Sequence, residues 1–317
     1  MRARAARFRC SVFATGLLVA ALIHAATGAE ADAAKRAPAI DSSRIVSIGG
    51  SITEILYALG EQQKIVAVDT TSLYPESALR EKPNVGYMRQ LSPEGVLALS
   101  PTLIFAVEGS GPKETIDVLE RAKIPFIVIP DKFTGDGIID KVEIIARDTG
   151  VPERGACLAR EVRSDLAALD VLRGKIRHHV KVAFLLSLAN GRLMVSGRDT
   201  AADGIIKMAG ADNAFDDFRG YKPVNDEALI AGKPEAILVM QRGEHALSAD
   251  MVFSQPALAM TPAAEHKTLV AMDGLYLLGF GPRTARAARD LAKRLYPDLA
   301  VAALPSEQLS GGNSCDQ

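Results

Sequence analysis

Short runs of apolar, largely β-branched residues alternate along the chain with helical patterns, and one long stretch lacks any strand signal. In the first part, strands are predicted at residues 44–48, 65–69, 103–107 and 126–129, with a helix at 112–122. In the second part, strands are predicted at 180–186 and 236–240, and helices at 200–209 and 284–295. Such alternation is typical of a mainly parallel sheet covered by helices. The pattern therefore predicts an α/β protein with two lobes.

The stretch between the two lobes, from Gly137 to about Lys175, has only helical periodicity. Its second half carries apolar residues at spacings of three and four, namely Leu158, Val162, Leu166, Leu169 and Leu172. Pro152 fits the first turn of that helix. The predicted organisation is an N-terminal lobe (40–135), a helical segment (136–176) with an interlobe helix at about 152–175, a C-terminal lobe (177–300) and a loose polar tail (301–317).

A capping box is predicted directly after the first strand. Ser51 would cap the helix that follows, and Glu54, three residues later, would complete the box. Gly60 would end this helix.

An internal repeat supports two related lobes. Residues 91–105 and 224–238 align without a gap, so that Glu94 matches Glu227 and Pro101 matches Pro234. Each copy predicts a short helix, a turn that contains proline, and a buried strand.

The first 29 residues differ from the rest of the chain. Four arginines precede an uncharged apolar stretch at residues 11–26, and small residues follow at the possible cleavage points Ala29 and Ala31. This pattern is typical of a secretory signal peptide (1–29), because the apolar run is shorter than the ~20 residues of a membrane-spanning helix. Cys10 precedes the apolar run, so no lipid anchor is expected. We expect an exported protein with a small acidic excess.

Composition and motifs exclude several functions. The chain has 317 residues with 37 basic and 38 acidic side chains, which argues against nucleic acid as the partner. There is no Gly-x-Ser-x-Gly motif, P-loop or Cys-x-x-Cys motif, and the histidines form no His-x-x-x-His pair. We therefore do not expect an enzyme. The remaining enzyme alternative is an exported α/β hydrolase that uses Ser51 or His245.

Two cysteines, Cys157 and Cys315, follow the signal peptide. An oxidising compartment permits a bond between them, but the sequence does not bring them within bonding distance. They are expected to be unpaired.

One loop, from Val85 to Leu91, carries distinctive chemistry. Gly86 marks a turn, and in an extended loop Tyr87 and Arg89 would point the same way. A neighbouring cation favours phenolate and lowers the pKa of tyrosine from its ordinary value of about 10. Phenolate oxygen suits ferric iron, and tyrosine is an axial ligand of haem. The alternative interpretation is a tyrosine packed in a loop beside an arginine.

The segment Tyr87-Met88-Arg89-Gln90-Leu91-Ser92-Pro93-Glu94-Gly95 resembles the haem-ligand segment of bacterial periplasmic haem-binding proteins, the substrate-binding components of haem-uptake ABC transporters. Residues 48–55 resemble the first strand-to-helix turn of that family, and residues 196–203 resemble its second-lobe counterpart. The resemblance runs from about Arg44 to Leu299. Only the Tyr-Met-Arg-Gln-Leu segment is specific to the haem branch, because the rest is shared with the vitamin B12 and ferric-siderophore binders.

The resemblance implies two Rossmann-like lobes joined by a single long helix, with ferric haem in the cleft between them. Tyr87 would be the axial ligand of the haem iron, and Arg89 would hydrogen-bond its oxygen. Some family members carry a histidine after the strand that matches 182–186, whereas this chain has Ser187-Leu188-Ala189-Asn190. Arg242 is the candidate for the second-lobe contact, with Tyr221 and His245 as alternatives.

The same resemblance implies the partners. Glu94 and Glu227 would dock onto basic residues of an ABC permease, which works with its ATPase at the inner membrane. The protein would carry haem through the periplasm, and an outer-membrane haem receptor is expected upstream. The alternative for both glutamates is a solvated first-turn position favoured by the helix dipole. The competing function is binding of a ferric siderophore or cobalamin, with Tyr87 only lining the pocket.

Overall fold

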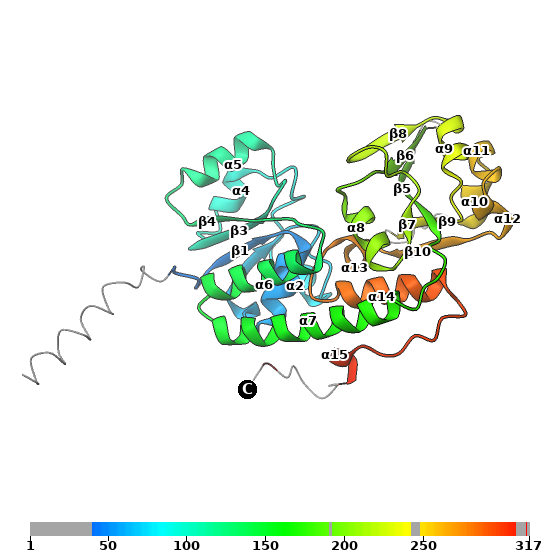
Figure 1. Cartoon of the computed structure of the whole chain (residues 1–317). Helices are drawn as coiled ribbons and strands as arrows, with labels where there is room; N and C mark the ends of the chain where they lie inside the picture. Colours follow the sequence, from blue (N-terminus) through cyan, green and yellow to red (C-terminus); the bar gives the residue numbers. More distant parts are fainter. Residues whose placement is uncertain (1–39, 190–191, 242–247, 309–314, 316–317) are drawn as a thin grey trace, which may run out of the picture. The chain divides into compact units, whose positions relative to one another are not determined.

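The structure is a computed structural model that describes residues 40–189, 192–241, 248–308 and 315 (Figure 1). The predicted signal peptide lies outside these residues. Within them, no helix combines the length and the apolar character needed to cross a membrane.

The first lobe is a parallel sheet flanked by short helices (Figure 1). Its four strands follow the order β2-β1-β3-β4 and are β1 (Ile45–Ile48), β2 (Ile65–Val68), β3 (Leu103–Val107) and β4 (Phe126–Ile129). The helical elements are α2 (Gly50–Ala58), η1 (Gln62–Lys64), α3 (Ser77–Glu81), α4 (Pro93–Leu97) and α5 (Lys113–Glu120). All four predicted strands are confirmed, because each is an apolar run long enough to cross a buried sheet.

The second lobe has a mixed sheet. Its strands follow the order β10-β9-β5-β6-β8, with β7 beside β5, and are β5 (Lys181–Ala189), β6 (Arg192–Ser196), β7 (Asp212–Asn213), β8 (Tyr221–Val224), β9 (Ala236–Gln241) and β10 (Leu269–Asp273). Strands β9 and β10 run parallel to β5, but β6 is antiparallel to both β5 and β8. The expectation of a mainly parallel sheet is therefore met by only part of this lobe.

Eight helices described in the second half cover this sheet and extend from it. They are α8 (Ala201–Met208), α9 (Asp226–Gly232), α10 (Ala249–Phe253), α11 (Pro256–Ala259), α12 (Pro262–Glu265), α13 (Gly274–Leu278), α14 (Thr284–Leu295) and α15 (Pro305–Gln308).

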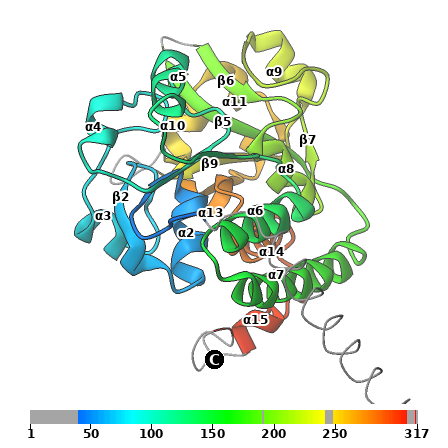
Figure 2. The same ribbon diagram turned by 90° about the vertical axis from the view of Figure 1, so that its left-hand side faces the viewer.

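Two consecutive helices follow β4: α6 (Gly135–Asp148), which packs against α2 of the first lobe, and the 22-residue α7 (Pro152–Arg173), the single long helix that joins the lobes, as expected. Pro152 occupies the first turn of α7, as predicted. Helix α7 packs against α6 at one end and against α14 of the second lobe at the other (Figures 1 and 2).

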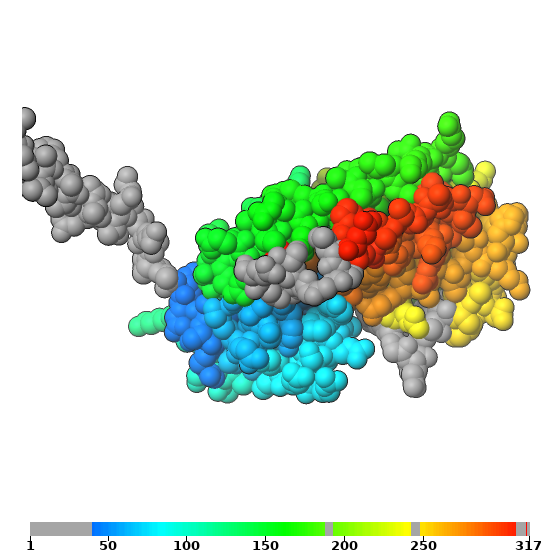
Figure 3. All heavy atoms as spheres, turned by 90° about the horizontal axis from the view of Figure 1, so that it is seen from below, coloured from blue at the N-terminus to red at the C-terminus, as the bar shows by residue number. Residues whose placement is uncertain are grey.

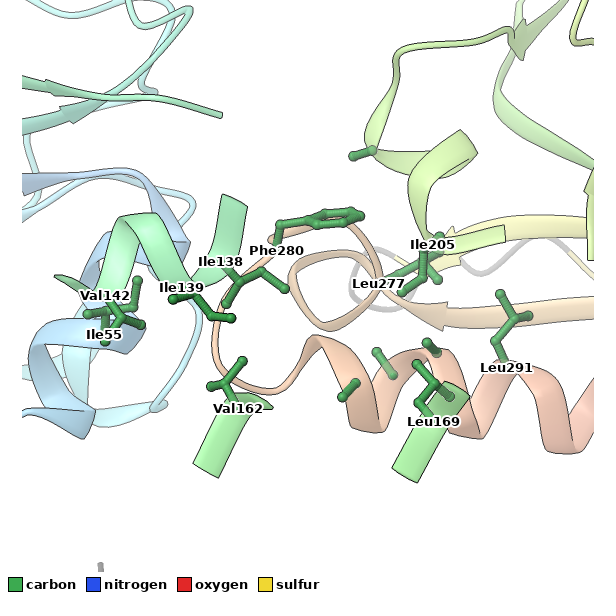
Figure 4. Packing of buried hydrophobic residues seen from close by; sticks show 14 of the residues in the cluster. Ile55, Ile138, Ile139, Val142, Val162, Leu169, Ile205, Leu277, Phe280 and Leu291 are labelled. Carbon is green, nitrogen blue, oxygen red and sulfur yellow. The ribbon is translucent and has the colours of Figure 1, made fainter. Parts of the chain in front are cut away.

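A single buried cluster extends from one lobe into the other (Figure 4). It includes Ile55 of α2, Val142 of α6, Val162 and Leu169 of α7, Ile205 of α8 and Leu291 of α14. Because interiors are close-packed and resist deformation, this shared core couples the two lobes mechanically.

The C-terminal segment is held against α7, so the expectation of a loose tail is wrong for its described part. Figure 3 shows this segment, in red, beside the green surface of α7. The Ser306 backbone N–H donates to Asp165 Oδ1 at 2.9 Å, and Cys157 of α7 is disulfide-bonded to Cys315 across a Cα–Cα distance of 5.7 Å. The expectation of unpaired cysteines is also wrong, because the tail folds back along the helix that carries Cys157.

The predicted capping box is wrong. Gly49, with φ +123°, precedes α2 and no side chain caps the helix, while Ser51 lies inside its first turn. Glu54 is 5% exposed and accepts instead from Arg283, through the backbone N–H at 3.1 Å and through Nη2 at 2.9 Å. Its carboxylate therefore joins α2 to the segment before α14.

Candidate functional site

The loop that carries Tyr87 lies at the carboxyl end of β2. Val85 N–H donates to the Val68 carbonyl at 2.9 Å, and Thr70 N–H donates to the Gly86 carbonyl at 3.0 Å. In open α/β sheets, ligands bind outside the carboxyl ends of the strands, at the point where the strand order reverses. In the order β2-β1-β3-β4 that point lies between β1 and β3, so the loop is next to it.

A tight turn shapes this loop. Gln90 N–H donates to the Tyr87 carbonyl at 2.7 Å, and the turn is fixed to the segment after β3 because Gly111 N–H donates to the Met88 carbonyl at 2.9 Å. The expectation of an extended loop is therefore wrong here. The turn is built into the sheet edge by backbone hydrogen bonds, so its position is well defined.

The turn separates its apolar and polar side chains. Leu91 is 5% exposed and Met88 is half-buried, whereas Tyr87 is 41% exposed and Arg89 is exposed. Among the described residues, no hydrogen bond or ion pair joins the Tyr87 phenol to the Arg89 guanidinium. Both side chains can therefore meet a ligand.

Tyr221, on β8 of the second lobe, interacts electrostatically with Arg89 of this turn. Its ring is 37% exposed and packs edge-on against Phe184 at 6.3 Å between centroids. Burial raises the pKa of Tyr221, and interactions with Thr200 and with the Ala202 backbone lower it. The Arg89 cation lowers the same pKa, while the Asp131 carboxylate raises it. Arg89 and Asp131 of the first lobe therefore act electrostatically on this phenol of the second lobe.

Asp131 and Glu108 follow β4 and β3 at the carboxyl edge of the first sheet. Asp131 N–H donates to Glu108 Oε2 at 3.0 Å, which fixes one loop to the other. Neither residue was predicted from the sequence as part of the site. The only sequence feature that could have indicated them is their position, because each closely follows a strand predicted to be parallel.

Arg242 and His245 lie outside the described residues, so Arg242 stays a prediction. Ser51, proposed for the rival hydrolase, is 4% exposed within α2.

Glu94 and Glu227 hold equivalent positions, which confirms the structural part of the repeat. Each is the second residue of a short helix, after a capping side chain: Ser92 Oγ accepts from Gly95 N–H and Asn225 Oδ1 accepts from Ala228 N–H. Both glutamates are exposed. The pKa of Glu94 is lowered by its own backbone N–H and then by the Ser92 hydroxyl, which donates to Glu94 Oε2 at 2.9 Å.

A pocket of ≈ 280 Å³ lies away from this site, between α2, α7 and α14. Its lining includes Tyr57, Tyr74, Asp165 and Arg286 but none of Tyr87, Arg89 and Tyr221. The candidate site is therefore separate from this pocket.

Comparisons with known proteins identify the family of this chain. Residues 45–275 match the family described as periplasmic binding protein. The structure resembles that of the periplasmic haem-binding protein RhuT from Roseiflexus sp. RS-1, with a TM-score of 0.77 and 38% identity over 82% of this chain and 100% of that one. It also resembles the periplasmic haem-binding protein HutB of Vibrio cholerae, with a TM-score of 0.73 and 35% identity over 81% and 100% of the two chains.

A vitamin B12-binding protein of Yersinia pestis (strain Pestoides F) is 30% identical over 203 residues, which cover 64% of this chain and 71% of the relative. The chain therefore belongs to the periplasmic binding protein family, whose members are substrate-binding components of ABC importers and not enzymes.

Proposed function

We propose that this protein binds ferric haem at the Tyr87 turn and delivers it to an inner-membrane ABC importer. The observation that carries the proposal is that Tyr87 and Arg89 stand exposed on one turn at the carboxyl edge of the first sheet, while the Arg89 cation acts on the Tyr221 phenol of the other lobe. Haem needs an iron ligand, charges for its propionates and apolar or aromatic surface. These residues offer a phenol oxygen, a cation and a second ring.

Each residue has a role in this proposal. The Tyr87 phenolate binds the iron, and Arg89 supplies positive charge next to it for the phenolate or a propionate. Tyr221 contributes the second-lobe surface that faces Arg89. Arg242 is retained as a further propionate contact. The solved structures similar to this chain include several named as haem-binding proteins, which supports haem over other chelates.

The second candidate substrate is cobalamin or a ferric siderophore, in which case Tyr87 only lines the site. The observation that favours it is the similarity to vitamin B12-binding proteins. These large chelates also fit a site formed between two lobes.

Glu94 and Glu227 dock onto the permease in this proposal. They are exposed, occupy equivalent helix positions in the two lobes, and so present two carboxylates to one partner surface. The partners are the permease and its ATPase, with an outer-membrane haem receptor upstream. Residues 1–29 serve as the signal peptide that directs the protein to the periplasm.

Substrate titrations separate the two candidates. The protein purified from the periplasm is titrated with ferric haem, cyanocobalamin and a hydroxamate ferric siderophore, with visible absorption and calorimetry as readouts. We expect a saturable Soret shift with haem and no heat of binding with cobalamin. Tight cobalamin or siderophore binding without a Soret shift would refute the haem assignment.

A further inference from the structure

Lys141 of α6 is a charged side chain with no exposed surface. Its ammonium donates to Asp131 Oδ1 at 2.5 Å and to the Phe280 carbonyl at 3.4 Å. A charge buried in this way is tolerated only when it is paired and hydrogen-bonded. These two contacts therefore offset the cost of burying the ammonium.

The two partners of Lys141 come from different lobes. Asp131 follows β4 in the first lobe, and Phe280 lies between α13 and α14 in the second. Figure 4 shows Phe280 between Ile138 of α6 and Leu277 of α13. Lys141 therefore forms a polar bridge between the lobes, embedded in their shared apolar core.

Close packing surrounds this bridge. The rings of Phe133 and Phe280 meet edge-on at 5.3 Å between centroids. Gly204 of α8 lies so close that a Cβ atom there would be 2.7 Å from the Phe133 carbonyl oxygen and 2.8 Å from Phe280 Cζ. The two lobes therefore meet without spare room at Gly204, beside the bridge.

The same junction borders the candidate ligand site. Asp131 faces Tyr221, and Thr200 and Ala202, at the start of α8, also interact with the Tyr221 phenol. Helix α8 then continues to Gly204 at the junction. Helix α8 thus links the surroundings of Tyr221 to the junction that Lys141 bridges.

We propose that Lys141 is a positioning residue for the ligand: it joins Asp131 of the first lobe to the Phe280 carbonyl of the second and so sets the separation between Tyr87 and Tyr221. This inference rests on the proposed function, because its ligand is the haem held between these tyrosines. Lys141 itself touches no ligand.

Two variants separate positioning from simple charge pairing. Lys141→Met removes the bridge and leaves the Asp131 carboxylate without its partner, so both the Tm and the haem affinity fall, the affinity roughly tenfold. The double variant Lys141→Met/Asp131→Asn removes the unpaired charge as well. Its Tm recovers, but its haem affinity stays low because the lobes remain unbridged.

Recovery of haem affinity together with the Tm in the double variant would overturn the proposal, since Lys141 would then only neutralise Asp131. The control is Leu119→Ala on α5, a fully buried residue of a separate apolar cluster within the first lobe. It lowers the Tm but keeps the wild-type affinity. If Lys141→Met does not fold, the double variant is compared with Asp131→Asn alone, in which the amide oxygen can still accept from Lys141: weaker haem binding in the double variant supports the proposal, and equal binding refutes it.

A ligand-free measurement keeps this test independent of the substrate. Spin labels are attached through Val118→Cys on α5 and Met251→Cys on α10, positions that are 44% and 54% exposed. Pulsed electron paramagnetic resonance then reports the distance between the lobes. We expect a broader or shifted distribution in the double variant, and an unchanged distribution would overturn the proposal. A wild-type protein that takes up no haem would refute the proposed function, while these distances would still test the bridge.

Discussion

Removal of the Cys157–Cys315 disulfide is expected to destabilise the protein without changing the ligand site. The bond links residues 158 positions apart. In the loop-closure model, the entropy that a cross-link over such a loop removes from the unfolded chain raises its free energy by about 5 kcal/mol at 25 °C. The measured decrease in the free energy of unfolding when a disulfide is removed is typically about 2–4 kcal/mol. We expect the free energy of unfolding to fall by about 3 kcal/mol, because disulfides usually stabilise proteins by less than the loop-closure model predicts.

The loss of Tm follows from the size of the chain. For a large domain, each 1 kcal/mol shifts the Tm by about 2–4 °C, so the expected decrease is roughly 6–12 °C. Two contacts of the tail survive without the bond: Ser306 with Asp165, and Arg289 with Glu307. The folded state should therefore remain intact, with the loss arising mainly from a freer unfolded chain.

Differential scanning calorimetry of the oxidised protein, the reduced protein and the variant Cys157→Ser/Cys315→Ser measures this effect. The reduced protein and the variant should show the same lower Tm. The reductant should have no effect on the variant, which serves as the control. Two free thiols in the oxidised protein would refute the disulfide, and an unchanged Tm in the variant would refute its stabilising role.

Three further outcomes are expected. Glu94→Arg combined with Glu227→Arg should abolish haem uptake in cells and leave haem affinity unchanged; lost affinity in the titration would contradict the docking role. Ser92→Ala should raise the pKa of Glu94, because it removes a hydroxyl donor to the carboxylate, and should cost roughly 1 kcal/mol as a lost helix cap. Since the pKa of Glu94 now lies below its ordinary value, the wild-type carboxylate stays charged to lower pH than in the variant, which a carbon-13 NMR titration checks. Gly204→Ala should destabilise the fold by about 1–3 kcal/mol and weaken haem binding, because its Cβ would lie 2.7 Å from the Phe133 carbonyl; the control Gly174→Ala, with neighbours no nearer than 3.6 Å, should do neither.

The strands of the first lobe were predictable because burial on both faces demands continuous apolar runs, as in Leu103–Val107, where every residue is buried. The repeat was predictable for a similar reason. Each copy places a polar capping residue, a short helix and an apolar strand in the same order, and the structure shows α4 with β3 and α9 with β9. These features are local in the sequence.

The missed features depend on contacts that are distant in the sequence. Glu54 binds Arg283, 229 residues away, instead of capping its own helix. The pairing of Cys157 with Cys315 requires the tail to return along α7, which no local pattern reveals. The β5–β6 hairpin is an exception, because the Asn190-Gly191 dipeptide between two apolar runs is a recognised hairpin signal that could have been used.

The candidate site was predictable in part. Tyr87 and Arg89 stood out through the chemistry of their side chains, but the turn that carries them is fixed by backbone hydrogen bonds to Gly111, beyond the next strand. Asp131 and Lys141 were not recognised, because an ion pair at a lobe junction has no sequence signature.

A ferric haem titration of Tyr87→Phe against the wild type tests whether Tyr87 is the ligand of the haem iron. The substitution removes one oxygen atom from a side chain that is 41% exposed, so the fold should be unaffected. Tyr74→Phe is the matched control, because Tyr74 is 43% exposed and lies against Arg283, among the residues that line the separate pocket. We predict that Tyr87→Phe loses the tyrosinate-to-iron charge-transfer band and most of the haem affinity, while Tyr74→Phe retains both. An unchanged spectrum and affinity in Tyr87→Phe would contradict the assignment of Tyr87 as the iron ligand.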